Sequence, residues 1–332
     1  VEHFDGMRQF DIKTPDTALK DALLKKIDNL CKPKASLGRL EELALQIGLA
    51  QQTLSPTFQH PCHLLFGGDH GVEREGVSAA PREVTWQQMV HFAKGGGGVN
   101  LFCRQHGFKF IEVDMGVDHD LSAYPTILNH KMGNGTRNFL YEAAMTEEEM
   151  DRCIDIGAGL AKKCYTEGSN VICLGDMGVG NTSPSSVWMS LLGHQELHVC
   201  VGAGSGLSNN GIWHKVEVLQ NAVDQFYSTM RNRSHLTEEI IRWFGGFEMV
   251  AAVGAMLQAA ELGMMVLVDG FVMSAWGANK DREKGIEAGL DLEMPGDSEY
   301  CRWSIINAVK EGTLKEEELD IAVRRVLSIV KA

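Results

Sequence analysis

The sequence has 332 residues, of which 44% are hydrophobic, and its formal net charge is −13. This length and composition are typical of one large α/β domain, alone or with a small second domain, and they provide enough apolar residues for a sizeable core. The negative charge argues against nucleic acid or an anionic membrane as the main partner, so a phosphate-bearing ligand would need a local site.

The predicted elements begin with helical patterns in residues 1–50, which we expect to pack on the main domain. Thr146 with Glu149 forms a capping box that predicts a helix start, and Thr313 with Glu316 forms another before the last helix. Between these helical patterns lie short apolar runs followed by Gly or Asp, as in the strands of a covered parallel sheet. They are 62–67, 108–113, 170–175, 197–202 and 264–269.

This alternation predicts an α/β fold with a mostly parallel sheet and helices on both faces (Rossmann-like), plus the helical N-terminal segment. We divide the chain into that segment (1–50), a main α/β domain (51–271) and a C-terminal strand–helix segment (272–332) that completes the fold. Ligands in such sheets bind at the carboxyl ends of the strands, so the loops that follow the strands are the candidate sites.

The loop DMGVGNTSPSS (176–186) follows one predicted strand and opens a predicted helix. Its glycines, Gly178 and Gly180, let the backbone approach a ligand closely. Small polar residues then supply neutral donors at the helix start, where free amides favour a phosphate; they are Asn181, Thr182, Ser183, Ser185 and Ser186. A strand-to-helix turn rich in capping residues explains the pattern equally well.

A second glycine-rich loop, VGAGSGLSNNGIWHK (201–215), contains Gly202 and Gly204 and ends in Lys215, a candidate counter-charge for a phosphate. The spacing is not that of a dinucleotide-binding GxGxxG fingerprint, nor that of a Walker loop. A third glycine cluster, 94–100, predicts either a flexible lid or a close-packed helix start.

Asp69 and His70 follow the first central strand in GGDHGV. A metal site or an acid/base pair is one interpretation, but no second ligand lies at a suitable spacing, and a structural hydrogen-bond hub is favoured. Gln88, on a predicted helix, either hydrogen-bonds a flat heterocycle or is a surface amide. We predict no metal and no cofactor.

Nine motifs, in order from about residue 17 to about residue 271, resemble the nicotinate-nucleotide–dimethylbenzimidazole phosphoribosyltransferase family. They are KPKASLGRLE (32–41), GGDHGV with EGVS and REVT, FAKGGGGVN, DMGV, GNGTRNF, AAMT, LGDMGVGNTSPSS, VGAGSGL and GGFEMVAAVGAMLQAAELGMMVLVDGF (245–271). The resemblance implies a homodimeric enzyme of cobalamin assembly. It would transfer the phosphoribosyl group of nicotinate mononucleotide to 5,6-dimethylbenzimidazole, giving α-ribazole phosphate and nicotinate.

The resemblance also implies roles for individual residues. Those around the ribose phosphate would be Gly178, Asn181, Thr182, Gly204 and Lys215, with Gly180, Ser183 and Gly202 in the same loops. Gln88 and Met177 would form the slot for the benzimidazole. Asp176 is the candidate catalytic carboxylate, where the family usually has Glu, and Ala35 replaces a usual Gly.

The resemblance ends near Phe271, because the family's GEGTGA-type segment with its general-base glutamate is missing. Residues 274–297 and 311–332 resemble instead the end of the barrel of family 3 glycoside hydrolases, with Ala275 in place of the nucleophilic aspartate. This predicts a chimera, natural or engineered, with a junction in 269–275; a drifted C-terminal end is the alternative. After such a junction the segment would supply a helix (280–288), a strand (290–294) and a closing helix. Glu293 is a candidate substitute base, or an exposed loop carboxylate.

Three functions follow from these patterns. The first is the phosphoribosyl transfer, impaired if the base is missing; the second is a catalytically inactive chimeric or nucleotide-binding protein; the third, a glycoside hydrolase relic, is disfavoured by Ala275. The eight cysteines form no CxxC pair, no apolar run reaches the roughly 20 residues of a membrane span, and no signal-peptide pattern is present. We therefore expect reduced thiols and a cytoplasmic protein.

Overall fold

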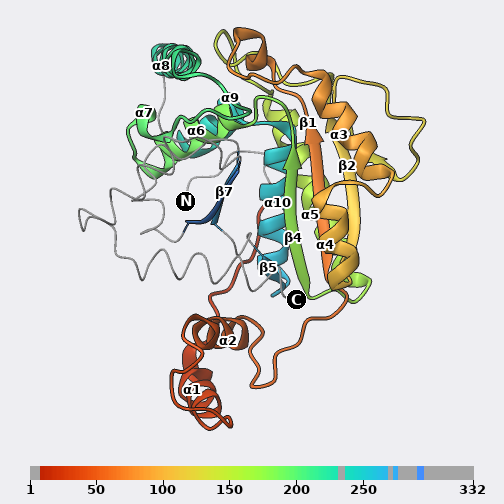
Figure 1. Cartoon of the computed structure of the whole chain (residues 1–332), viewed down its shortest axis with the longest axis vertical. Helices are drawn as coiled ribbons and strands as arrows, with labels where there is room; N and C mark the ends of the chain where they lie inside the picture. The colour runs from red at the N-terminus through yellow and green to blue at the C-terminus, as the bar shows by residue number, and fades with distance from the viewer. Residues whose placement is uncertain (1–7, 231–235, 268–271, 276–289, 295–332) are drawn as a thin grey trace.

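A five-stranded parallel sheet forms the centre of the protein in the computed structural model, which describes residues 8–230, 236–267, 272–275 and 290–294. The strand order is β3-β2-β1-β4-β5, and every neighbouring pair is parallel (Figure 1). The strands are β1 (Cys62–Gly68), β2 (Lys109–Gly116), β3 (Ile127–Asn129), β4 (Val171–Met177) and β5 (Met265–Leu267). This is the Rossmann-like order, in which the direction of winding reverses between β1 and β4.

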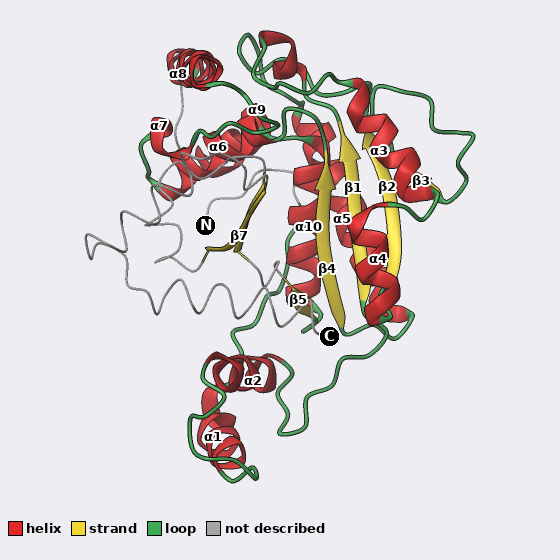
Figure 2. Cartoon of the chain, in the orientation of Figure 1, coloured by secondary structure: helices red, strands yellow, loops and turns green. Residues whose placement is uncertain are grey.

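Helices cover both faces of this sheet, as predicted (Figure 2). On one face α5 (Glu147–Thr166) and α10 (Phe247–Glu261) pack on Leu64 and Phe66 of β1. On the other, Leu65 contacts a cluster that includes Met89 of α3 (Glu83–Ala93); α4 (Gly97–His106) follows α3 and contacts it. Successive residues of β1 thus alternate between two cores, as a strand covered on both faces requires.

Four of the five predicted strands are confirmed, and the one at 197–202 is wrong. Residues Leu197–Cys200 form a short helix, α7. Leu197, Cys200 and Val201 are buried whereas Val199 is 59% exposed, a spacing of three to four residues that suits a helix. An apolar run of this length does not separate the two structures from sequence alone. The position beside β4 is taken by β5.

The remaining helices form a second core beside the sheet. They are η2 (Gly71–Glu75), α6 (Thr182–Gly193), α8 (Asn209–Thr229) and α9 (Leu236–Phe244). Aromatic rings join them, since Phe226 of α8 makes edge-on contacts with Trp243 and Phe244 of α9. This second core supports the start of α6, which lies over the carboxyl end of β4 (Figure 1).

The N-terminal segment is helical, as predicted. It contains η1 (Thr17–Leu19), α1 (Lys20–Asp28) and α2 (Arg39–Ala50), and α1 and α2 pack on each other below the sheet in Figure 1. Between them Ala35 has φ +58°. That left-handed conformation is unstrained only for glycine, which gives a physical reason for the Gly expected at this position.

In the C-terminal part, the predicted strand at 290–294 is confirmed as β7 (Leu290–Met294). It pairs in parallel with β6 (Val272–Ala275) in a two-stranded sheet. The helix predicted around 280–288 and the final capped helix lie outside the described residues.

The cysteines of the described part are free thiols, in agreement with the prediction: Cys31, Cys62, Cys103, Cys153, Cys164, Cys173 and Cys200. None of the helices within 8–230 and 236–267 combines the length and the apolar character that crossing a membrane requires.

Glu112 is an acid buried inside the sheet. It lies in β2 between Leu65 of β1 and Ile127 of β3 and is 3% exposed. Within the described part of the chain, its Oε1 has no hydrogen-bond partner. Burial raises the pKa of Glu112 to about 8, so the side chain is neutral at neutral pH.

Replacing Gly157 by Ala is expected to lower the free energy of unfolding by about 3 kcal/mol. A Cβ there would overlap the carbonyl oxygen of Ala251 in α10. Gly159 of the same helix has no atom within 4 Å of such a Cβ, so Gly159→Ala should instead stabilise the protein by about 0.5–1 kcal/mol. Urea unfolding measures both; equal effects would contradict the close packing of α5 and α10.

The pKa of Glu112 predicts a pH dependence of stability. The unfolded chain releases this proton near pH 4.5, whereas the folded protein keeps it to about pH 8. Stability is therefore lost as the pH rises through this window. Glu112→Gln removes the loss, so the variant should gain stability relative to wild type, by roughly a few kcal/mol at the upper end. Urea unfolding at both ends of this pH window tests the prediction. A difference in free energy of unfolding between variant and wild type that stays constant with pH would contradict it.

Candidate functional site

The candidate site lies where the winding of the sheet reverses, at the carboxyl ends of β1 and β4. Phe66 of β1 is in register with Asp176 of β4, and Gly67 with Met177. The loop that follows β1 therefore lies beside residues 178–181, which connect β4 to α6. Ligands of doubly wound sheets bind at such a reversal point.

The loop 178–181 is shaped by glycine and held by a side-chain hydrogen bond. Gly180 has φ +90°, a conformation that favours glycine. Asn181 precedes α6 and donates from Nδ2 to Oδ2 of Asp176 over 2.6 Å. The turn from β4 into α6 is thereby closed by two residues that the sequence placed in the site.

A second group of predicted residues meets at the start of α6. Lys215 of α8 is fully buried and donates from Nζ to Thr182 Oγ1 over 2.7 Å. Gly204, with φ +55°, lies against both, since a Cβ there would be 2.9 Å from Thr182 Oγ1 and 3.6 Å from Lys215 Nζ. An ammonium group, a hydroxyl group and the amino end of a helix thus converge, an arrangement that favours an anion.

Ser183 belongs to the same first turn of α6. It is fully buried, and its Oγ has no hydrogen-bond partner within the part of the chain that the structure describes. Gly202 is also buried, in the loop that carries Gly204. Ser205 of that loop accepts hydrogen bonds from the backbone N–H groups of Ala79 and Ala80, at 3.0 and 2.9 Å. The loop 201–208 is therefore tied to the segment that precedes α3.

Asp176 is the carboxylate of this site. Its side chain is exposed, yet the protein around it displaces solvating water, which together with the nearby Glu248 carboxylate raises the pKa of Asp176. The hydrogen bond from Asn181 and the charge of His70 act in the opposite direction. A carboxylate with a raised pKa is a better proton acceptor at neutral pH than an ordinary Asp.

The two residues predicted for the benzimidazole slot, Met177 and Gln88, are associated through helix α3. Met177 is half-buried and packs against the apolar cluster that contains Met89 and Val90 of α3. Gln88 is half-buried on the same helix. Within the described residues, no hydrogen bond joins Gln88 to the loop 178–181. Met177 is thus a partly exposed apolar side chain beside the site, supported from below by the buried Met89.

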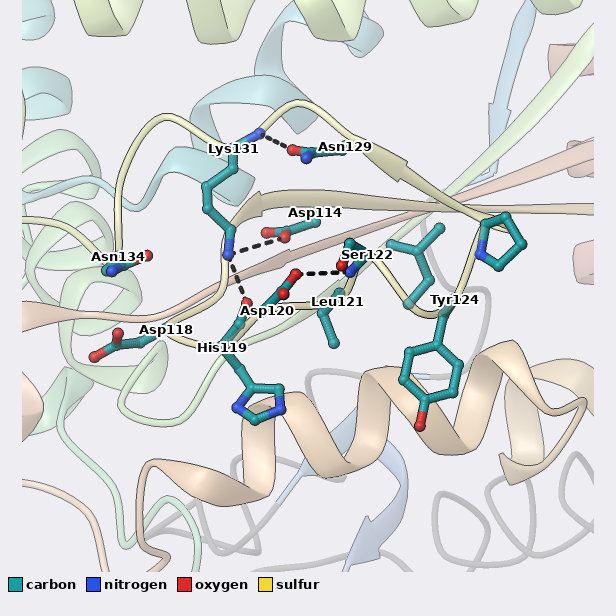
Figure 3. A pocket seen from close by; sticks show the side chains of 12 residues that line it. Asp114, Asp118, His119, Asp120, Leu121, Ser122, Tyr124, Asn129, Lys131 and Asn134 are labelled. Atoms are coloured by element: carbon teal, nitrogen blue, oxygen red, sulfur yellow. Dashed lines mark hydrogen bonds and ion pairs between the residues drawn. The ribbon is translucent and has the colours of Figure 1, made fainter.

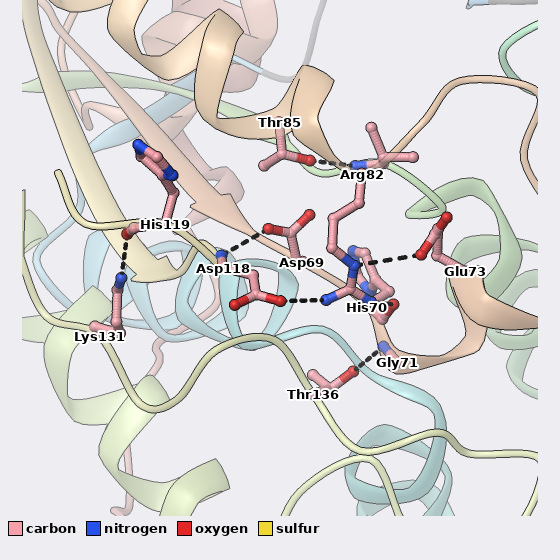
Figure 4. Close-up of polar contacts among 11 residues, drawn as sticks. Asp69, His70, Gly71, Glu73, Arg82, Thr85, Asp118, His119, Lys131 and Thr136 are labelled. Carbon is pink, nitrogen blue, oxygen red and sulfur yellow. Dashed lines mark hydrogen bonds and ion pairs between the residues drawn. The ribbon is translucent and has the colours of Figure 1, made fainter.

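Asp69 is a hydrogen-bond hub, as favoured from the sequence (Figure 4). Its Oδ2 accepts the backbone N–H of Asp118 over 2.7 Å. Arg82 donates to the carbonyl oxygen of His70 over 2.9 Å and pairs with Asp118 at 3.2 Å and Glu73 at 3.3 Å. These contacts tie the end of β1 to the end of β2.

One pair of site residues was not anticipated. His70 Nε2 lies 2.8 Å from Oε1 of Glu248, near the start of α10, and both side chains are buried. The sequence showed no partner for His70 at short spacing, and Glu248 is 178 positions away. The available signal was an acid directly after GGF in an otherwise apolar helix.

A cavity of about 560 Å³ lies beyond β2, at the ends of β2 and β3 (Figure 3). Lys131 crosses it, donating to the carbonyl oxygen of His119 over 2.6 Å and lying 3.4 Å from Asp114. The His119 ring stacks on Trp86 of α3, with 4.2 Å between ring centroids. Among the residues that the structure describes with their side chains, none of those predicted for the site lines this cavity.

Glu293, the candidate substitute base, is placed only by its backbone. It lies in β7 in register with Ser274 of β6, and its side chain lies outside the described residues. The role of Glu293 stays a prediction.

Comparisons with known proteins agree with one another. A family model described as phosphoribosyltransferase matches residues 12–279. Two relatives, from Bacteroides fragilis (strain YCH46) and Phocaeicola vulgatus (strain ATCC 8482), are 56% and 54% identical over 268 residues, which is 81% of this chain and 76% of each relative. Both are named nicotinate-nucleotide–dimethylbenzimidazole phosphoribosyltransferase.

A solved structure, that of CobT from Thermus thermophilus, is 31% identical in sequence and superimposes with a TM-score of 0.69. It covers 77% of this chain and 74% of its own. The shared architecture extends the sequence similarity to the α/β fold.

Gly204→Ala is expected to weaken the binding of inorganic phosphate by about tenfold or more, because the new methyl group would press on Thr182 Oγ1 and lie against Lys215 Nζ. Gly206→Ala is the matched control. Its φ of +108° is also strained for alanine, but nothing lies within 4 Å of its Cβ. Titration calorimetry compares the two, and an equal loss in both would contradict the anion site.

Proposed function

Because this chain belongs to the nicotinate-nucleotide–dimethylbenzimidazole phosphoribosyltransferase family, we propose that it transfers the phosphoribosyl group of nicotinate mononucleotide to 5,6-dimethylbenzimidazole. The products are α-ribazole phosphate and nicotinate, and the reaction serves cobalamin assembly. The observation that carries this proposal is the buried contact of Lys215 with Thr182 beside Gly204. It supplies a phosphate site at the reversal point of the sheet.

The phosphate of the nucleotide binds to this group. Lys215 supplies a full charge, while Thr182 and the first turn of α6 supply hydrogen-bond donors. Ser183, whose buried hydroxyl lacks a partner within the described residues, is a further donor. Because the sequence is strongly acidic overall, this fixed local charge is what holds the substrate.

The reaction requires that the two substrates are held in position and that one group accepts a proton. The ring nitrogen of dimethylbenzimidazole forms a bond to C1′ of the ribose as the bond from C1′ to the nicotinate nitrogen breaks. The pyridinium nitrogen takes the bonding electrons and leaves as neutral pyridine, so it needs no proton. The proton on the attacking heterocycle passes to a carboxylate, and Asp176, with its raised pKa, is the acceptor that we assign.

The acceptor heterocycle lies against Met177, with Gln88 as the hydrogen-bonding side chain of α3. Met177 packs on the cluster around Met89. A thioether surface suits a flat aromatic ring, because sulfur–aromatic contacts are favourable.

The family match reaches residue 279, which is eight positions beyond the end of the resemblance noted near 271. The likeness of 272–332 to the end of a glycoside hydrolase barrel, and with it the chimera, stays a prediction. So do the homodimer and the cytoplasmic location.

The experiment measures nicotinate release from nicotinate mononucleotide with and without dimethylbenzimidazole. We expect release that depends on the acceptor. Lys215→Met should raise KM for the nucleotide by about tenfold to a hundredfold, the loss of one charged hydrogen bond. Lys109→Met is the control, since Lys109 lies at the amino end of β2 in an exposed ion pair with Glu167. Absence of acceptor-dependent release in the wild type, or equal KM values in the two variants, would overturn the proposal.

A further inference from the structure

A buried pair of opposite charges lies directly below the loop 178–181. His70 follows β1, and Glu248 is the second residue of α10; their side chains are 1% and 0% exposed. His70 Nε2 and Glu248 Oε1 are 2.8 Å apart, as an ion pair and not as an aligned hydrogen bond. Neither residue is used by the reaction as described above.

Three glycines from three segments enclose the pair. A Cβ at Gly68 would lie 2.6 Å from Glu248 Oε2, and one at Gly246 would overlap Glu248 Oε1. A Cβ at Gly178, the first residue of the loop, would lie 3.0 Å from His70 Nε2. The ring and the carboxylate are therefore in contact with the backbone of β1, of the residue before α10 and of the site loop at once.

The surroundings of His70 favour its charged form. Glu248 has no other hydrogen-bond partner within the described residues, and neither does Nδ1 of His70. A lone buried carboxylate would be very costly, so the imidazolium compensates it. Burial by itself lowers the pKa of His70, but Glu248, and beyond it Asp69 and Asp176, raise it above the usual value.

Carboxylates face His70 from three elements. Glu248 belongs to α10 and Asp176 to β4, while Asp69 directly precedes His70 in the chain. Arg82 binds the backbone carbonyl of His70 and not the ring. The imidazolium is thus a positive charge close to three carboxylates, while Arg82 also acts on Asp69.

We propose that His70 and Glu248 form a positioning pair: the buried imidazolium, held by Glu248, fixes the loop 178–181 and keeps the Asp176 carboxylate ready to accept a proton. The inference rests on the proposed function for its effect on turnover. Its effect on the loop does not depend on that function. Both side chains are buried, so the proposed role is one of positioning.

The experiment compares His70→Asn, Glu248→Gln and the double variant with the wild type. Glu112→Gln is the matched control, because it too replaces a buried glutamate by its amide, but on the face of the sheet away from α10. The measurements are kcat/KM as a function of pH, thermal unfolding, and amide exchange at residues 178–181. Each single variant is expected to lose about tenfold to a hundredfold in kcat/KM, the cost of a displaced catalytic group.

The pH profile separates a positioning role from a merely structural one. His70 lowers the pKa of Asp176, so its removal in His70→Asn should move the acidic limb of kcat/KM to higher pH. The double variant removes both charges and leaves none buried alone. We therefore expect it to regain thermal stability without regaining kcat/KM.

Two results would overturn the proposal. One is a double variant whose kcat/KM recovers together with its stability; the other is a set of variants whose loop exchange and pH profile match those of Glu112→Gln. If the wild type shows no acceptor-dependent nicotinate release, the proposed function fails on its own. Amide exchange at residues 178–181 then still tests whether the pair fixes the loop: faster exchange in both single variants supports this role, and unchanged exchange refutes it.

Discussion

The parallel pairing of β1 with β4 is the constraint on which the rest of the structure depends. Its register sets Gly67 beside Met177 and so places the segment after β1 against the segment after β4. The winding reverses between these two strands, and ligands of doubly wound sheets bind at such an edge. Every residue assigned to chemistry lies on one of those loops or on a helix that packs against them.

Charge is concentrated at this edge and balanced locally. Lys215 is buried beside the start of α6, and His70 is buried beside Glu248. Buried charges interact more strongly than exposed ones, since water screens them less. In the proposed function, one fixed ammonium group thus lets an acidic protein bind an anionic nucleotide, and in the proposed positioning pair the imidazolium adjusts the carboxylate of Asp176. The two cations serve different partners and come from different segments of the chain.

Sequence patterns were reliable where a single element carried the signal. The capping box of Thr146 and Glu149 starts α5, with both hydrogen bonds present, and four apolar runs became strands. The run at 197–202 failed because hydrophobicity without a clear period suits a buried helix as well as a strand. β3 was not predicted, since three residues carry too little pattern. The loops proposed to bind phosphate were selected by their glycines and hydroxyl groups, which are local features.

The sequence by itself determined the fold class, the family, and the residue types available for binding a phosphate. It did so because helix and strand periods, caps and glycine-rich turns are written in neighbouring residues. Only the tertiary structure decided which of these residues meet. Lys215 reaches Thr182 across 33 positions, and Glu248 reaches His70 across 178. Such contacts depend on strand order and helix packing, which arise from the burial of the whole chain, and no local pattern encodes them.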